Sequence, residues 1–232
     1  MIKKQSDIQL VSKKEPRYRI TATLLNSWQY IWDCKEYVFE GENDDICYED
    51  KLAIARDGAT KKFIDLLNRI PVEDNEAMRK GREYEDLVCS GYDAVFSPLV
   101  KNGAFQVKLT KDVTICGLPI TLYGILDVLK GGRIMDIKRV GKYQYPKYKT
   151  SHQHPMYLYL APNAIDFTYL IYDDGIESKV EEKQKNAHNL ERYTRENCED
   201  IIEVCERFIN WLIANDLIEI FKEKWQINFE EE

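Results

Sequence analysis

The 232-residue sequence lacks the short motifs that most often carry metal or phosphate chemistry. Its only histidines are His152, His154 and His188, and there is no H-E-x-x-H pattern, which excludes that type of metalloprotease and any histidine-rich metal site. It has neither G-x-x-x-x-G-K nor G-x-G-x-x-G, the two commonest glycine-rich loops that cradle phosphates. ATP hydrolysis and dinucleotide-dependent chemistry are therefore disfavoured.

Cysteine spacing and the lack of long apolar runs exclude further classes. The six cysteines include no Cys-x-x-Cys pair, which favours reduced, buried thiols over a disulfide framework or a zinc knot. No stretch approaches the roughly 20 apolar residues that a membrane helix needs. The N-terminus is basic but has no apolar segment or small-residue cleavage site typical of a secretory signal. We therefore expect a cytoplasmic protein without a membrane partner.

The composition is that of a globular chain. With 44% hydrophobic and 31% charged residues, the sequence is neither collagen-like nor wholly disordered. A chain of this length buries roughly 70–75% of the surface that its unfolded form exposes, so it needs no covalent cross-links. The net charge of -7 argues against coating nucleic acid through global attraction, although it leaves room for a local basic groove.

The hydrophobic period changes along the chain. It is helical in the first part, where one helix is capped near Thr23 and a later one is stopped by Pro71, and it falls to two after Gly91. We predict a single domain, 1–232, of the α/β (α+β) class, with a mixed central sheet flanked by helices. Its parts are a helical region at about 20–91, with helices at about 48–70 and 75–90; a sheet core at about 92–182, with strands at 104–109, 113–116, 119–129, 133–140, 165–173 and 176–182 and a helix at 151–161; and a C-terminal helix at about 195–214.

A predicted hairpin carries the most informative residues. Gly131 and Gly132 between two β-rich runs are typical of a two-residue turn, because both accept positive φ. That turn would place Asp127 opposite Asp136, on the same face, with Cβ atoms about 4.5–5.5 Å apart. Their neighbours are apolar, so an uncompensated carboxylate pair would be costly there. A cation is expected between them, either Lys138 or a divalent ion with oxygen ligands.

Two alternatives without a catalytic role apply to this pair of aspartates. The acids and Lys138 could form an ionic cluster without catalysis, or a one-residue bulge could separate the acids. A third carboxylate and a phosphate-directed basic surface would favour a functional site.

Glu85 is the candidate third carboxylate. It lies on the stripe formed by Ala77, Gly81, Tyr84 and Val88, so it falls on the apolar face of the third predicted helix. Gly81 would let that helix approach the sheet closely. The alternative is that Glu85 sits at the edge of the stripe and reaches solvent.

A basic, tyrosine-rich segment follows the hairpin. Residues 138–149 contain five basic residues and three tyrosines with no acid, which is typical of a phosphate-tracking groove as well as of a solvated loop. In the next helix Gln153 and Tyr157 share one face, provided that Pro155 lies in the first turn. The pair could contact a substrate or Lys138, or be an ordinary hydrogen-bonded glutamine and a core tyrosine. The loop's candidate contacts are Arg139, Lys142, Tyr143, Lys147 and Lys149.

These motifs together resemble the PD-(D/E)XK nuclease superfamily, in its RecB-like and lambda-exonuclease-like branch. The resemblance covers residues 20–175 in the family's order. It comprises the opening Thr21-Ala-Thr-Leu-Leu-Asn-Ser, the helical Gly81-Arg-Glu-Tyr-Glu85, the strands Gly124-Ile-Leu-Asp127 and Met135-Asp-Ile-Lys138, and the helix Gln153-His-Pro-Met-Tyr157.

The resemblance implies a restriction-endonuclease-like core and a metal-dependent phosphodiesterase acting on DNA. Glu85, Asp127, Asp136 and the backbone carbonyl of Ile137 would hold one or two Mg²⁺ or Mn²⁺ ions. Lys138 would orient the attacking water or stabilise charge on the phosphate. Gln153 and Tyr157 would steady that lysine and contact the DNA strand.

The sequence departs from the family in two respects. Leu126 stands where a proline is common in this branch. Some relatives hold an iron-sulfur cluster through one N-terminal and three C-terminal cysteines, whereas only Cys198 and Cys205 lie near this C-terminus. We therefore expect no iron-sulfur cluster. Cys34 is the N-terminal cysteine that would be its candidate ligand.

The branch favours an exonuclease for DNA ends in recombination, repair or phage replication. A recombination or single-strand-annealing protein is a candidate partner, and both a monomer and an oligomer fit. The alternatives are a catalytically silent DNA-binding or scaffold domain of the same fold, and a structure-specific endonuclease.

Overall fold

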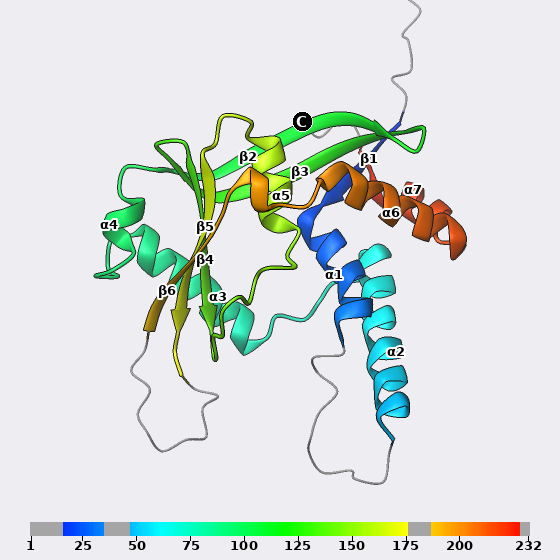
Figure 1. Cartoon of the computed structure of the whole chain (residues 1–232), viewed down its shortest axis with the longest axis horizontal. Helices are drawn as coiled ribbons and strands as arrows, with labels where there is room; N and C mark the ends of the chain where they lie inside the picture. Colours follow the sequence, from blue (N-terminus) through cyan, green and yellow to red (C-terminus); the bar gives the residue numbers. More distant parts are fainter. Residues whose placement is uncertain (1–15, 35–46, 176–186, 228–232) are drawn as a thin grey trace, which may run out of the picture.

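A computed structural model describes residues 16–34, 47–175 and 187–227. A seven-stranded mixed sheet and seven α-helices account for most of them (Figure 1). In chain order the elements are β1 Arg17–Thr21, α1 Ala22–Asp33, α2 Tyr48–Leu67, α3 Glu76–Cys89, α4 Ser97–Val100, β2 Ala104–Ile115, β3 Leu118–Lys130, β4 Arg133–Val140, α5 Gln153–Leu160, β5 Asp166–Asp173, β6 Ala187–Tyr193, a 3-10 turn Arg195–Asn197, α6 Ile201–Ala214, α7 Ile218–Trp225 and β7 Gln226–Ile227.

The predicted fold class is confirmed. The strand order is β6-β5-β4-β3-β1-β7, and β2 also pairs with β3. The pairs β1–β3 and β4–β5 are parallel and the others antiparallel, so the sheet is mixed. Two predicted strands are in fact one, β2, which runs without interruption. The predicted strand at 176–182 lies outside the described residues, and β6 is the strand that pairs with β5.

The predicted hairpin turn is confirmed, but the predicted strand pairing holds only for the residues next to the turn. Gly131 and Gly132 have φ of +56° and +76°, and the ladder pairs Leu129 with Ile134 and Val128 with Met135. It ends there, so Asp127 and Asp136 are not ladder partners. On the same edge of β3, β1 pairs only as far as Tyr123. Residues 124–127 therefore face neither strand on that edge, because β1 and β4 diverge at this point.

Two helix boundaries differ from those predicted, each for a local reason. The side chain of Thr21, two residues before the predicted cap, accepts a hydrogen bond from the Leu24 amide at 3.2 Å and begins α1. The predicted second helix ends at Leu67, before Pro71, because Arg69 adopts a left-handed conformation with φ of 56°. Ile70 consequently falls outside the helix and is 52% exposed.

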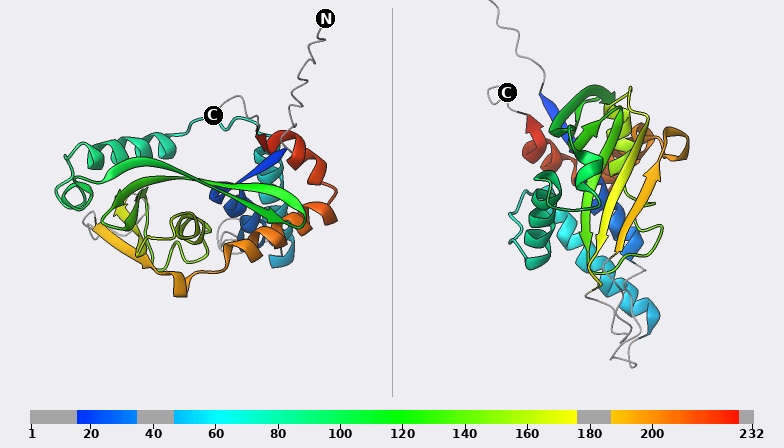
Figure 2. Two further views of the ribbon diagram at one scale, coloured as in Figure 1. Left: turned by 90° about the horizontal axis from the view of Figure 1, so that it is seen from above. Right: turned by 90° about the vertical axis from the view of Figure 1, so that its left-hand side faces the viewer.

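Helices cover both faces of the sheet. Figure 2 (left) shows α3 and α4 on one side of β2 and β3, and α5 on the other. On the first side Tyr84 and Val88 of α3 join a small core with Met135 and Ile137 of β4. The main core contains the buried face of α5 together with residues of α1, α2 and α6. The region where β3 and β4 diverge is thus bordered by α3 and by α5.

Candidate functional site

Asp136 lies at the centre of the candidate site. It is fully buried on β4, between β3 and β5. The amide Nε2 of Gln153, at the start of α5, donates to its Oδ1 at 2.5 Å. Lys138, two residues along the strand, forms an ion pair with its Oδ2. That oxygen has no partner with hydrogen-bond geometry among the described residues, so its ligand capacity is only partly used.

Asp127 faces the same centre from β3. Because the ladder has ended, the backbone amide of Ile137 donates to its Oδ2 at 2.9 Å. Burial and the negative charge of Asp136 raise the pKa of Asp127 to about 8, although the Lys138 ammonium opposes them. The two acids are therefore close enough to repel each other, as the hairpin predicted, but the contact between strands is made through a side chain.

Glu85 reaches the site from α3. It is half-buried, and Gln106 of β2 donates to its Oε1 at 2.6 Å. Burial and the charge of Asp136 both raise the pKa of Glu85. Glu85 thus contacts β2 while part of its side chain remains exposed to solvent. Gln106 has a φ of 51°, an uncommon conformation for a residue other than glycine within a strand.

Lys138 is the cation nearest to these acids. Its side chain is 30% exposed, so one part of it faces solvent. Burial alone would lower the pKa of Lys138, but the charges of Asp136 and Asp127 outweigh burial and raise it. The charge of Lys138 acts on Glu85 and Asp127 as well as on its ion-pair partner Asp136, and the three carboxylates outnumber the cations at this site in the described part of the chain when all three are ionised.

The donor chemistry fits a hard divalent cation. Carboxylate oxygens are the ligands that Mg²⁺ and Mn²⁺ prefer, and the incompletely used Oδ2 of Asp136 is one such donor. The side chains are not arranged as a complete metal site. Within the described ranges, no three Asp, Glu, His or Cys side chains are placed to hold an ion together. Each acid instead has a protein partner, which a bound ion would have to replace in part.

The predicted pair on α5 lies at the site, with one role changed. Gln153 contacts Asp136 and not Lys138, so it positions the carboxylate where we had expected it to steady the lysine. Tyr157 is buried against Gly124, where an added Cβ would come within 2.5 Å of the tyrosine Cε1. Glycine is therefore required for α5 to approach β3, and Pro155 falls in the first turn as predicted.

The basic segment after β4 is partly tied to the fold. Arg139 forms an ion pair with Asp174 at 3.1 Å. The hydroxyl of Tyr143 donates to Glu191 at 2.9 Å, and the ring of Tyr148 stacks on Tyr169 at 4.3 Å. These tyrosines brace the loop against β5 and β6. The exposed basic side chains of the segment are Lys142, Lys147 and Lys149.

The cysteines with a suggested cluster role belong to the main core or pack against it. Cys34 is buried and donates to the Ile31 carbonyl, and Cys198 donates to that of Thr194. Cys205 is buried on the apolar face of α6, in line with the core role that its spacing predicted.

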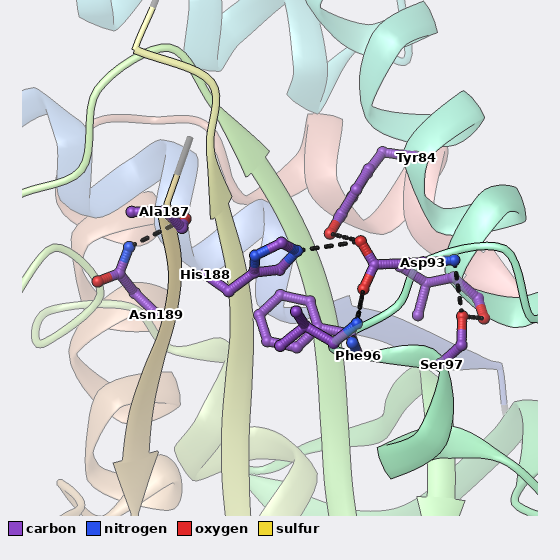
Figure 3. Close-up of polar contacts among 9 residues, drawn as sticks. Tyr84, Asp93, Phe96, Ser97, Ala187, His188 and Asn189 are labelled. Carbon is purple, nitrogen blue, oxygen red and sulfur yellow. Dashed lines mark hydrogen bonds and ion pairs between the residues drawn. The ribbon is translucent and has the colours of Figure 1, made fainter. Parts of the chain in front are cut away.

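A buried polar cluster that the sequence analysis missed joins α3 to β6 (Figure 3). Asp93 accepts from the Tyr84 hydroxyl at 2.9 Å and lies 3.0 Å from His188 Nε2. It also accepts from the backbone amides of Val95 and Phe96. No local pattern marks this cluster, because Asp93 and His188 are separated by 95 residues.

We expect Asp93→Asn to lower the free energy of unfolding by about 2 kcal/mol, because it removes charge-assisted hydrogen bonds from a buried group. For a chain of this size the melting temperature would fall by about 4–8 °C. Burial opposes ionisation, but the Phe96 amide and His188 hold the pKa of Asp93 below its usual value. This stabilisation is therefore present above the unfolded-state pKa and is lost as the pH falls through the folded-state pKa.

Urea unfolding at neutral and acidic pH measures this effect. Asn189→Ala is the matched control, since Asn189 neighbours His188 but its side chain donates to the Ala187 carbonyl of its own strand. Equal stability of the Asp93 variant and the wild type at neutral pH would contradict the role given to the cluster.

No helix in the described part of the chain has the length and apolarity that a bilayer crossing requires. No family model and no curated protein matches this sequence. Among solved structures, that of SSO0001 is 14% identical and aligns over 88% of this chain and 80% of its own, with a TM-score of 0.42. A structure named "Putative exonuclease" from Eubacterium rectale is 9% identical over 96% of this chain and 88% of its own, with a TM-score of 0.44. Both likenesses are too distant to carry chemistry to this chain, whose function must be inferred from the site.

Proposed function

We propose that this protein is a metal-dependent DNA nuclease of the PD-(D/E)XK superfamily, in the RecB-like branch. The observation that carries the proposal is the placement of Asp127 and Asp136 beside Lys138 where β3 and β4 diverge. Glu85 of α3 lies near enough for the charge of Asp136 to raise its pKa, although the three acids are not arranged to hold an ion together in the described residues. Two strands and a helix supply these groups, in the order that the sequence motifs predict. An ion-pair cluster built only for stability would not need three mutually repelling carboxylates around one ammonium group.

The three carboxylates and the carbonyl of Ile137 would hold one or two Mg²⁺ or Mn²⁺ ions. Such ions polarise a phosphodiester and lower the pKa of a bound water. The protein's own contribution starts with Lys138, whose ammonium group would orient the attacking water or stabilise charge on the phosphate. Gln153 holds Asp136 in place through its amide. Tyr157 and the basic segment, with Arg139, Lys142, Tyr143, Lys147 and Lys149, would contact the DNA strand.

We further propose that the enzyme is an exonuclease acting on DNA ends in recombination, repair or phage replication. This choice rests on the branch that the motifs resemble. A recombination or single-strand-annealing protein is the partner class that such an activity implies, and assembly into an oligomer is compatible with it. A silent DNA-binding domain and a structure-specific endonuclease are the alternatives that the test must separate.

Digestion of linear, circular and end-blocked DNA, each with Mg²⁺ and with a chelator, provides that test. An exonuclease degrades linear DNA in Mg²⁺ and spares the circular and end-blocked forms. Cleavage of circular DNA would identify an endonuclease. Binding without any cleavage in Mg²⁺ or Mn²⁺ would identify a silent domain and refute the catalytic proposal.

A further inference from the structure

A second concave surface lies away from the acidic site, at the end of the sheet formed by β1, β2, β3 and β7. It is a cleft of about 650 Å³ to which β1, the turn after α2, β2 and α7 each contribute a basic side chain. In Figure 1 these strands and α7 meet at the opposite end of the molecule from α4. The residues that define this basic cleft are Arg19, Arg69, Lys108, Tyr123, Lys224 and Trp225.

Aromatic rings hold two of these guanidinium groups in place. Arg19 lies over the Tyr123 ring at 4.6 Å, and Arg69 lies over the Trp225 ring at 4.2 Å. Arg69 is further fixed because its Nε donates to the Lys224 carbonyl at 2.7 Å. Arginines held in this way lose little conformational entropy when they bind a ligand, and the guanidinium fork matches phosphate oxygens.

Three of the four basic side chains of the cleft have no ionic partner in the described part of the protein, whereas the fourth, Lys224, pairs with Glu223 at 2.7 Å. Within that part, Arg19, Arg69 and Lys108 form no ion pair, and Nε of Arg19 is buried without a hydrogen-bond partner. The nearby Asp112 is engaged by Arg17 and by the Thr121 hydroxyl. Burial and the charge of Arg19 lower the pKa of Arg69, as expected for crowded cations.

No acidic residue of the described ranges lines the cleft, although the whole chain carries a net charge of -7. Concentrating unpaired cations on one concave surface of an acidic protein is costly unless an anion is bound there.

We propose that the basic cleft binds the phosphate backbone of the DNA strand whose cleavage is proposed above. The substrate identity rests on that proposed function, whereas the preference for phosphates follows from the cleft itself. The position is suitable, because Tyr123 precedes Asp127 by four residues on β3, about 13 Å along a strand. DNA leaving the acidic site would thus meet the cleft within a few nucleotides.

The double variant Arg19→Gln, Arg69→Gln tests this inference. Binding of a fluorescent DNA oligonucleotide, single-stranded and duplex, is measured by anisotropy over a range of salt concentrations in a chelator, so that no cleavage is needed. Loss of two phosphate contacts should reduce the slope of log affinity against log salt by about 2, and weaken binding by about 10-fold or more. The control, Arg56→Gln with Lys101→Gln, removes two exposed charges elsewhere and should match the wild type.

The outcomes separate this inference from the nuclease proposal. An unchanged affinity and salt slope in the cleft variant, or a wild type that binds no DNA, overturns the cleft assignment. Release of the oligonucleotide by millimolar inorganic phosphate at constant ionic strength would show a pocket for a single phosphate and would also overturn it. Binding that depends on the cleft in a protein that never cleaves DNA upholds the cleft and refutes the nuclease.

Discussion

Asp136→Asn is expected to reduce Mg²⁺-dependent DNA cleavage by about 10³-fold or more while the protein remains folded. The change keeps the side-chain volume and the oxygen that accepts from Gln153, but removes the charge from the most buried acid of the site. A neutral amide cannot replace a carboxylate as a ligand for a hard divalent ion. Initial rates on linear DNA, with melting temperatures of both proteins, measure the effect.

The chain offers a matched control in Asp166→Asn. Asp166 is also fully buried and also ion-paired, with Arg133 and Arg192, but it lies at the start of β5 away from the acidic site. This variant should keep its cleavage rate even if it loses stability. Normal cleavage by a folded Asp136→Asn protein would refute the site assignment.

Lys138→Ala should also abolish cleavage, but it is a harder experiment to interpret. It leaves the buried Asp136 without its cation, which typically costs about 3–5 kcal/mol of stability. The double variant Asp136→Asn, Lys138→Met removes the buried charge together with its partner and keeps the test independent of folding.

Asp127→Asn is expected to stabilise the metal-free protein at alkaline pH. Burial and Asp136 raise the pKa of Asp127 to about 8 in the folded state, above its ordinary value near 4. The folded protein then binds more protons than the unfolded chain between these values, so this group's contribution to stability falls as the pH rises through that window. Asparagine has no such charge, and its side-chain oxygen can still accept from Ile137.

The expected gain at pH 8 to 9 is about 3 kcal/mol. A shift of four pKa units would correspond to about 5 kcal/mol for an isolated group, and partial exposure of Asp127 to solvent reduces that figure. Denaturant unfolding in a chelator from pH 5 to pH 9 measures the difference between wild type and variant. Asp57→Asn, on the exposed side of α2, is the control and should show no such pH dependence.

Added Mg²⁺ gives a second readout for the same variant. An ion held by the three acids should stabilise the wild type in a concentration-dependent way and should stabilise Asp127→Asn much less. A stability difference that does not change with pH would show that Asp127 is not electrostatically strained. Equal stabilisation of both proteins by Mg²⁺ would show that it is not a ligand.

Much of the fold and the positions of several acidic side chains on their helix or strand could be predicted from local patterns. Two adjacent glycines determined the turn at Gly131 and Gly132, because their backbone conformation needs no tertiary support. The apolar stripe on α3 correctly predicted that Glu85 points toward the sheet, since helical periodicity determines which residues share a face. The strand spacing of Asp136 and Lys138 likewise placed them side by side.

The details of the site could not be predicted, because they depend on partners far away in the sequence. Pairing of Asp127 with Asp136 required a ladder that continued, and it stops where β1 and β4 take different parts of the same edge of β3. The contact of Gln153 with Asp136 depends on how closely α5 approaches Gly124.

The amino-acid sequence by itself determined the types of residue available, the turns, the helix faces and hence the class of fold, because these are governed by short-range backbone preferences and hydrophobic periodicity. Only the tertiary structure decided which groups meet. It brought Asp93 to His188, and it collected Arg19 of β1, Lys108 of β2 and Arg69 of the turn after α2 into one cleft. Strand order and helix docking place these groups together, and neither is encoded within any short stretch of chain.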